Sequence, residues 1–119
     1  LLLAQMSSSG NLLEGSYTDK TLEMGTASPH VIGYIGNGSR PPDLKELRSK
    51  VGEGKMIWTP GVNIDSQEGV LGQRYGNPSE AVRAGSDAII VGSGIHRSAD
   101  PLSAAREYAS ASWFALLER

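Results

Sequence analysis

The fold is decided by the stretch Ala88-Ile89-Ile90-Val91-Gly92-Ser93-Gly94, in which a short apolar run ends in a Gly-x-Gly turn. An apolar run of this length, bounded by small residues, is typical of a parallel strand buried on both faces. Gly-x-Gly at a strand end lets backbone N–H groups approach an anion closely, and a helix starting nearby adds partial positive charge. The stretch therefore indicates a phosphate site, although its two glycines also fit a plain tight turn.

Three similar apolar runs precede this stretch, and a segment with helical periodicity follows each of the four runs. Such an alternation of strands and helices favours a parallel sheet in the α/β class. The 119 residues fit a single domain and about half of the roughly 250 residues of a (β/α)₈ barrel. We therefore expect residues 1–119 to form a (βα)₄ half of a TIM barrel. The phosphate site expected after the last strand favours the C-terminal half, since barrels form that site after strands seven and eight. The expected strands are Leu1–Met6, Val31–Gly36, Met56–Val62 and Ala88–Gly92, and the expected helices are Tyr17–Ala27, Pro42–Val51, Pro78–Ala84 and Asp100–Arg119.

Local signals mark where the helices begin and which side chains they bury. Thr18 with Asp19, Asn77, and Asp100 before Pro101 each stand where a side-chain N-cap is expected. The last helix carries an apolar stripe that we expect to face the core: Leu102, Ala105, Ala109, Trp113 and Leu116. Trp58 is expected in the core as well, and Asp87, which precedes the last strand, is expected to be structural.

The composition excludes several classes of protein. With 39% hydrophobic and 20% charged residues, the chain is typical of a soluble globular protein, and its net charge of −2 gives no basic footprint for nucleic acid. It has no cysteine, hence no disulfide and no thiolate metal site, and no apolar run approaches the ~18 residues of a membrane span. The opening Leu1-Leu2-Leu3-Ala4 lacks the basic lead of a signal peptide and predicts a piece of a longer chain.

The candidate site residues lie in the loops after the expected strands, which form the active face of a barrel. Ser7 follows the first strand, and its hydroxyl either binds a ligand or caps the loop. Gln73 and Tyr75 lie in a Gly-bounded segment after the third strand, where they either reach a phosphate or pack the loop. No Walker loop, nucleophile elbow or HExxH motif occurs, so the residues assemble neither a nucleophile nor a general acid.

Six segments, in this order along nearly the whole chain, resemble orotidine 5′-phosphate decarboxylase, most closely its eukaryotic branch, which includes the C-terminal domain of uridine 5′-monophosphate synthase. The resemblance implies a dimeric (β/α)₈ barrel that converts orotidine 5′-monophosphate to uridine 5′-monophosphate in the cytoplasm, as a step of pyrimidine synthesis, without a metal or an organic cofactor. The segments are Met6–Gly10, Gly15–Thr18, Val31–Ile35, Thr59–Val62, Leu71–Tyr75 and Gly85–Gly92.

The resemblance also implies roles for six residues. Ser7 contacts the pyrimidine ring and Pro60 lines its pocket. Gln73 bridges base and phosphate, Tyr75 binds the phosphate, and Gly92 and Ser93 hold it from the last strand. We expect the chain to pair with a second copy of itself or with an N-terminal half of the barrel, since unpaired strand edges favour pairing.

Three departures from the family pattern matter. The family has Arg at the position of Ser93, and loss of its charge-assisted fork should weaken phosphate binding roughly 10-fold to 10³-fold. Gln5 stands where Glu is common. The family's catalytic D-x-K-x-x-D motif, which supplies the Asp and Lys network and the proton-donating Lys, is absent from these 119 residues. The chain alone is therefore expected to be inactive.

Two other interpretations stay open at this point. One is a non-catalytic half-barrel that self-associates and holds a phosphate. The other is a different phosphate-binding barrel enzyme, such as a sugar-phosphate synthase or isomerase, against which the pair of segments Thr59–Val62 and Gly72–Tyr75 argues.

Overall fold

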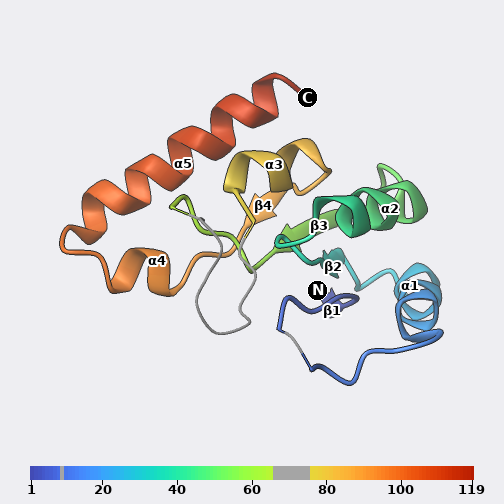
Figure 1. Ribbon diagram of the computed structural model, residues 1–119. Helices are drawn as coiled ribbons and strands as arrows, with labels where there is room; N and C mark the ends of the chain where they lie inside the picture. The colour runs from blue at the N-terminus through green and yellow to red at the C-terminus, as the bar shows by residue number, and fades with distance from the viewer. Residues whose placement is uncertain (9, 66–75) are drawn as a thin grey trace.

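The computed structural model describes residues 1–8, 10–65 and 76–119. A parallel sheet of four strands, paired in chain order, forms its centre (Figure 1). The register is continuous across the sheet, since Leu3 pairs with Ile35, Ile35 with Trp58, and Trp58 with Ala88. This confirms the predicted α/β class. The strands are β1 (Leu2–Leu3), β2 (Gly33–Ile35), β3 (Met56–Thr59) and β4 (Ala88–Ile89).

The strands are shorter than the apolar runs predicted. In β1 the cause is visible, because the N–H groups of Ala4 and Gln5 both donate to the Ile35 carbonyl, each at 3.0 Å. Two residues on one strand then face one on the other, which interrupts the ladder as a bulge does. The chain after Leu3 consequently leaves the sheet early and starts the loop that carries Ser7.

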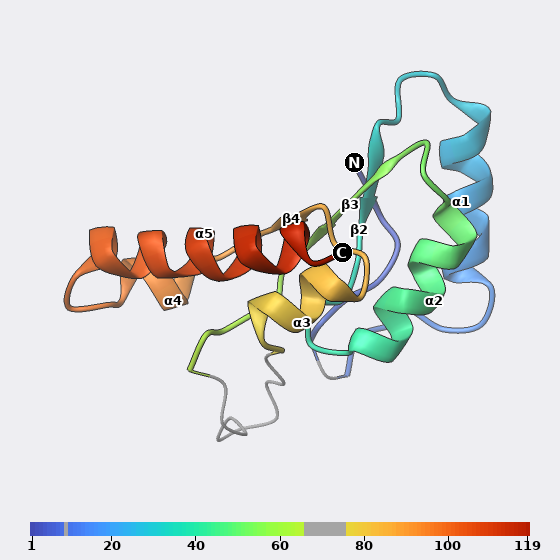
Figure 2. The same ribbon diagram turned by 90° about the horizontal axis from the view of Figure 1, so that it is seen from above.

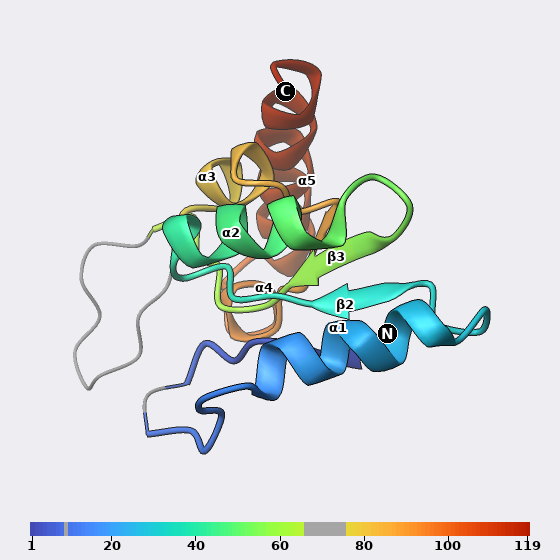
Figure 3. The ribbon, with the colours of Figure 1, turned by 90° about the vertical axis from the view of Figure 1, so that its right-hand side faces the viewer.

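The four predicted helices form, and a short fifth one, α4, was not predicted. Figure 3 shows α1 and α2 beginning at the end of the sheet to which the arrows of β2 and β3 point. Each helix thus runs back along the strand before it, as in a βα unit. The helices are α1 (Tyr17–Ala27), α2 (Pro41–Val51), α3 (Pro78–Arg83), α4 (Ser93–His96) and α5 (Pro101–Leu117).

Two of the three predicted helix caps are confirmed. Asn77 accepts a hydrogen bond from the Ser79 N–H at 2.9 Å, and Asp100 accepts one from the Ser103 N–H at 3.0 Å. The cap at Thr18 was wrong, because α1 begins at Tyr17 and its N-cap is Ser16, which lies two residues before Thr18 and makes no side-chain capping bond. The Thr18 hydroxyl instead donates to the Ala4 carbonyl at 2.8 Å and ties α1 to the end of β1.

The core lies between the sheet and its helices. Ala4, Tyr34 and Ile57 face the helices from the strands and pack with Leu44 and Leu47 of α2, all at most 1% exposed. Burying one such Leu or Ile stabilises the fold by about 1.5–3 kcal/mol. The Tyr34 ring lies over Gly25 of α1, where a Cβ atom would come within 2.2 Å of its hydroxyl oxygen. Gly25 is therefore the residue that lets α1 approach the sheet.

The opposite face of the sheet is only partly covered by the described residues, contrary to the expectation of strands buried on both faces. Figure 2 shows α1 and α2 to the right of β2 and β3, and α4 and α5 to the left of these strands. Leu3 and Met56 are both 39% exposed and Ile90 is 42% exposed. In a closed barrel this face would be the interior. The apolar runs are therefore those of barrel strands. In the described chain their helix-facing side is buried, and the side that would face the barrel interior is partly exposed.

The apolar stripe predicted for α5 does not face the core. The helix packs against α3 through Tyr108 and Ala115, the two buried residues of α5, and Ser79 donates to the Ala111 carbonyl at 3.2 Å. Leu102 is exposed, and Trp113, expected in the core, is 59% exposed. Trp58 is half-buried, with an indole N–H that has no hydrogen-bond partner among the described residues.

Asp87 joins three elements at the amino end of the sheet, away from the strand ends that carry the loops. Its carboxylate accepts from the Ile57 N–H at 2.8 Å, from Arg119 at 2.9 Å and from Arg48. Burial raises the pKa of this carboxyl, but the Ile57 N–H and the two guanidiniums outweigh it, so the pKa lies below its ordinary value. Asp87 is structural, as the sequence predicted.

Candidate functional site

Ser7 lies against the loop that follows β3. A side chain on Gly61 would come within 2.6 Å of the Ser7 Cβ and 2.9 Å of its hydroxyl oxygen, and Gly61 has a φ of +77°. Both the left-handed backbone and the close approach call for glycine at this position. The structure thus places Ser7, half-buried, directly beside the Pro60-Gly61 turn. Two loops that are far apart in the sequence meet here because parallel strands end at one edge of the sheet.

Pro60 is half-buried and held by the loop after β2. Its carbonyl accepts a hydrogen bond from the Gly38 N–H at 3.0 Å. Behind it, the hydroxyls of Thr59 and Ser86 are completely buried and bond to each other at 2.8 Å. The chain at Thr59 and Pro60 is therefore held from two sides, by Gly38 in the loop after β2 and by Ser86 in the segment before β4. A rigid proline is suited to form the wall of a ligand pocket.

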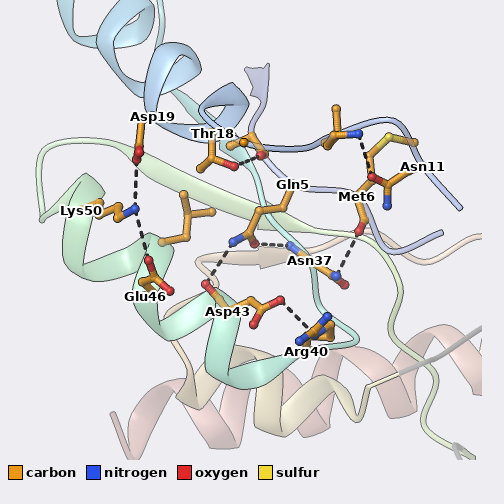
Figure 4. Close-up of a pocket in the computed structure, with 14 residues that line it drawn as sticks. Gln5, Met6, Asn11, Thr18, Asp19, Asn37, Arg40, Asp43, Glu46 and Lys50 are labelled. Carbon is orange, nitrogen blue, oxygen red and sulfur yellow. Dashed lines mark hydrogen bonds and ion pairs between the residues drawn. The ribbon is translucent and has the colours of Figure 1, made fainter. Parts of the chain in front are cut away.

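A network of side-chain amides holds the chain just before Ser7 (Figure 4). The Gln5 side chain accepts from the Asn37 N–H at 2.9 Å and donates to the Asp43 carbonyl at 3.0 Å. Asn37, which is buried, donates from its side chain to the Met6 carbonyl at 3.0 Å. These bonds join the end of β2 to Gln5 and Met6, the two residues that precede Ser7. Asn37 was not among the predicted site residues, and its only signal in the sequence is a polar residue between two glycines at a strand end.

This network borders a polar concavity between α1 and α2, on the helix side of the sheet (Figure 4). Its charged side chains pair with one another: Lys50 with Asp19 at 3.0 Å and with Glu46 at 3.2 Å. The hydrogen bonds to Asp19 and Glu46 raise the pKa of the exposed Lys50 ammonium. Because the charges are already neutralised within the protein, this concavity supports the loop of Ser7 rather than presenting a second site.

Gly92 and Ser93 form a second part of the candidate site, after β4. The Gly92 carbonyl accepts from the N–H groups of Ile95 at 3.0 Å and His96 at 3.1 Å, which closes the single turn of α4. Both residues are exposed. Among the described residues no acceptor bonds the backbone N–H groups of Ser93 and Gly94. N–H groups without a protein acceptor at a strand end can bind an anion.

Gln73 and Tyr75 lie outside the described residues, so the structure does not place these two predicted site residues. The chain is described on both sides of that stretch. Gly76 donates to the Gly61 carbonyl and accepts from the Asn63 N–H, each at 2.9 Å, and forms a parallel bridge with Val62. Gly76 therefore lies beside the same turn as Ser7.

Tyr108 of α5, which was not among the predicted site residues, connects the Gly92–Gly94 turn to Asn63 and Ile64 in the loop after β3. Its hydroxyl accepts from the Ile64 N–H at 3.0 Å and donates to the Asn63 side chain at 3.2 Å. A Cβ atom on Gly94 would come within 2.3 Å of the same hydroxyl oxygen. The available signal was a tyrosine within a helix otherwise rich in alanine and serine, which periodicity alone does not distinguish from a core residue.

The described residues contain no group of three or more His, Cys, Asp or Glu side chains placed to hold a metal ion. In the same part of the chain, none of the helices has the length and apolarity needed to cross a membrane.

A parallel sheet with small polar loops at the carboxyl ends of its strands places this chain in the α/β class, whose members bind their ligands at that edge. Residues 1–108 match the sequence family described as orotidine 5′-phosphate decarboxylase / HUMPS family. The chain belongs to this family, which confirms the resemblance drawn from the six segments.

Relatives and solved structures agree with this assignment. All of the chain aligns with 43% of the orotidine 5′-phosphate decarboxylase of Penicillium chrysogenum, at 37% identity over 120 residues. The decarboxylase of Coccidioides immitis (strain RS) is 39% identical over 121 residues, with the same shares of the two chains covered. The crystal structure of orotidine 5′-phosphate decarboxylase from Pyrococcus horikoshii OT3 superposes with a TM-score of 0.73 at 30% identity, covering 93% of this chain and 49% of that one.

The structure of orotidine 5′-monophosphate decarboxylase from Sulfolobus solfataricus has the same fold, with a TM-score of 0.73 at 24% identity over 97% of this chain and 49% of that chain. The four strands and their helices thus match about half of a decarboxylase TIM barrel. The chain spans less than half the length of the fungal relatives it matches.

Proposed function

We propose that this chain is the C-terminal half of an orotidine 5′-phosphate decarboxylase barrel and supplies the pyrimidine and phosphate contacts of the site. The ring contacts are Ser7 and Pro60. The phosphate contacts are Gln73, Tyr75, Gly92 and Ser93, and the ligands are orotidine 5′-monophosphate and uridine 5′-monophosphate. The observation that carries the proposal is the contact of Ser7 with Gly61, next to Pro60, because it brings together the two residues that the family pattern assigns to the ring.

The phosphate end is supported by the turn at Gly92-Ser93-Gly94. Its N–H groups face no protein acceptor among the described residues, and Gly76, which directly follows Tyr75, is hydrogen-bonded beside the Pro60-Gly61 turn. In this arrangement Ser93 offers a backbone N–H and a hydroxyl, whereas an Arg there would offer a charged fork. We therefore expect the phosphate to be bound, but weakly.

The chemistry itself is assigned to the other half of the barrel. Decarboxylation leaves a carbanion on the ring that must be protonated, and in this family an Asp and Lys network performs that step. The D-x-K-x-x-D motif is absent from this chain. The binding energy of the phosphate, far from the reacting carbon, is then used to hold the ring in place. This chain alone is expected to be inactive, and the assembled enzyme to act in the cytoplasm without a metal or organic cofactor.

The test is complementation. The chain is mixed with a polypeptide that supplies the N-terminal half of a fungal orotidine 5′-phosphate decarboxylase, and decarboxylation of orotidine 5′-monophosphate is followed by absorbance. We expect no turnover from either half alone and measurable turnover from the mixture. A Ser7→Ala variant should lower that turnover, whereas Ser110→Ala on the exposed surface of α5 should not. Formation of the complex without turnover, in both the natural chain and its Ser93→Arg variant, would contradict the proposal.

A second candidate function is a non-catalytic half-barrel that pairs with a copy of itself. It is favoured by the exposed apolar face of the sheet, with Leu3, Met56 and Ile90 all between 39% and 42% exposed. Two such faces could cover each other as the two halves of a barrel do. Sedimentation of the chain alone distinguishes the two candidates, because a stable self-paired dimer that resists exchange with the N-terminal half would favour the second.

A further inference from the structure

The apolar stripe predicted for α5 is largely uncovered in the described chain. Its residues recur at steps of three or four along the helix, the spacing at which one helix packs along another. Another face of α5, which carries its two buried residues Tyr108 and Ala115, is held against α3. The stripe itself is left open, with Leu102 62% exposed and Trp113 59% exposed. We call the following residues the α5 stripe: Leu102, Ala105, Ala109, Trp113 and Leu116.

The position of α5 in the row of helices indicates what covers this stripe. Because the strands pair in chain order, α1, α2, α3 and α5 follow one another along the sheet, and α5 is the last of them (Figure 1). Among the described residues, α5 packs against α3 and the single turn of α4. In a (β/α)₈ barrel the helices form a closed ring, so each has a neighbour on both sides. The chain matches 49% of a decarboxylase structure, so the second neighbour of α5 belongs to the other half of such a barrel.

We propose that the α5 stripe is the docking surface for an apolar helix face of the N-terminal half of the barrel, and that Trp113 is its central contact. The stripe carries no charged side chain, so its partner is apolar as well. Ala105 and Ala109 allow a facing helix to approach closely, and the Trp113 ring supplies the largest area to bury. The inference rests on the proposed function, since it names the outer surface through which the two halves of that barrel meet. Tryptophan is typical of the few residues that dominate the binding energy of an interface.

The test compares Trp113→Ser with Phe114→Ser in the chain mixed with the N-terminal half of a fungal decarboxylase. Phe114 is a matched control, because it is an adjacent aromatic residue, 65% exposed, but lies about 100° further around the helix axis and off the stripe. Since both rings are exposed, neither replacement should change the stability of the chain alone. Calorimetric titration measures the affinity between the halves. The emission of Trp113 is followed in a Trp58→Phe chain, which leaves one tryptophan, paired with an N-terminal half free of tryptophan.

We expect Trp113→Ser to weaken the pairing of the halves about 30-fold and Phe114→Ser to weaken it less than about 3-fold. The emission of Trp113 should shift to shorter wavelength when the N-terminal half binds. Halves that pair and restore turnover with equal affinity in the two variants, or with Trp113 still exposed, would overturn the inference and leave the proposed function standing. A dimer of the chain alone that Trp113→Ser breaks would show that a second copy covers the stripe, and would overturn it too. If the natural halves did not pair at all, the proposed function would fail, and the inference with it.

Discussion

The side-chain oxygen of Gln5 and the backbone N–H of Asn37 are 2.9 Å apart and hydrogen-bonded, which joins the end of β1 to the end of β2. Asn37 completes the connection by donating to the Met6 carbonyl. The position of Ser7 is consequently set by the loop of a neighbouring strand, not only by its own. Gln5 also donates to the Asp43 carbonyl, a bond that the Glu common at this position in the family could not make when ionised.

Replacement of Asn37 by Ala should lower the free energy of unfolding by about 1–3 kcal/mol, because the Met6 carbonyl and the Ser39 N–H lose a buried partner. Urea denaturation measures the change. The matched control is Asn11→Ala, since Asn11 makes two similar side-chain bonds but is exposed, and its loss should cost only about 0.5 kcal/mol. Equal losses in the two variants would show that the network around Asn37 does not hold the loop.

Gly61→Ala tests the contact between the first and third loops. We expect it to destabilise the fold by about 1–2 kcal/mol for the left-handed backbone and by about 1–3 kcal/mol more for the clash with Ser7. Gly15→Ala is the control, because Gly15 has a similar φ of +59° but open space around its Cβ position. The difference between the two unfolding free energies measures the clash. Gly61→Ala should also weaken uridine, whose ring Ser7 is proposed to contact, and Gly15→Ala should not.

How far the sequence predicted the fold depends on how local each signal is. The caps at Asn77 and Asp100 were predictable because a cap depends on three neighbouring residues. The length of β1 was not, because it is set by the Ile35 carbonyl that Ala4 and Gln5 share. Periodicity showed which residues of a helix share a face, but it did not show which face would meet α3.

For the site, the edge-of-sheet rule predicted that the loops carrying Ser7 and Pro60 would lie together, since parallel strands end at one edge. The bonds that fix these loops were not predictable. Those of Asn37 and Tyr108 reach across other elements, and their geometry follows only from the packed sheet. The roles assigned to Gln73 and Tyr75 remain predictions, because both residues lie outside the described part of the chain.

The three-way contact of Asp87 should make stability depend on pH in the acidic range. The folded state lowers the pKa of this carboxyl, so its contribution is fully present above the unfolded pKa of about 3.9 and is lost as the pH falls through the lower, folded value. Asp87→Asn should therefore lower the unfolding free energy at pH 7 by about 1–3 kcal/mol, since bonds to Arg119 and Arg48 lose their charge.

Denaturation curves at pH 7, 4 and 3 test this dependence. The difference between the natural chain and Asp87→Asn should shrink as the pH falls from 4 to 3. Asp43→Asn serves as the control, because its salt bridge to Arg40 is exposed and worth about 0–1 kcal/mol. A constant difference between pH 7 and pH 3 would mean that Asp87 does not titrate below its ordinary range in the fold.

Ser93→Arg tests the phosphate assignment directly. An Arg at this position would add a charge-assisted fork beside the free N–H groups of the Gly92–Gly94 turn, and each such bond is worth about 1.5–3 kcal/mol. We expect uridine 5′-monophosphate to bind the assembled barrel roughly 10-fold to 10³-fold more tightly, and uridine, which lacks the phosphate, to be unaffected. Ser110→Arg, on the exposed surface of α5, adds the same charge elsewhere and controls for general attraction of anions. Because a fork acts at short range, the gain should survive added salt better than the small gain from Ser110→Arg. An unchanged affinity in Ser93→Arg would show that the phosphate does not lie at this turn.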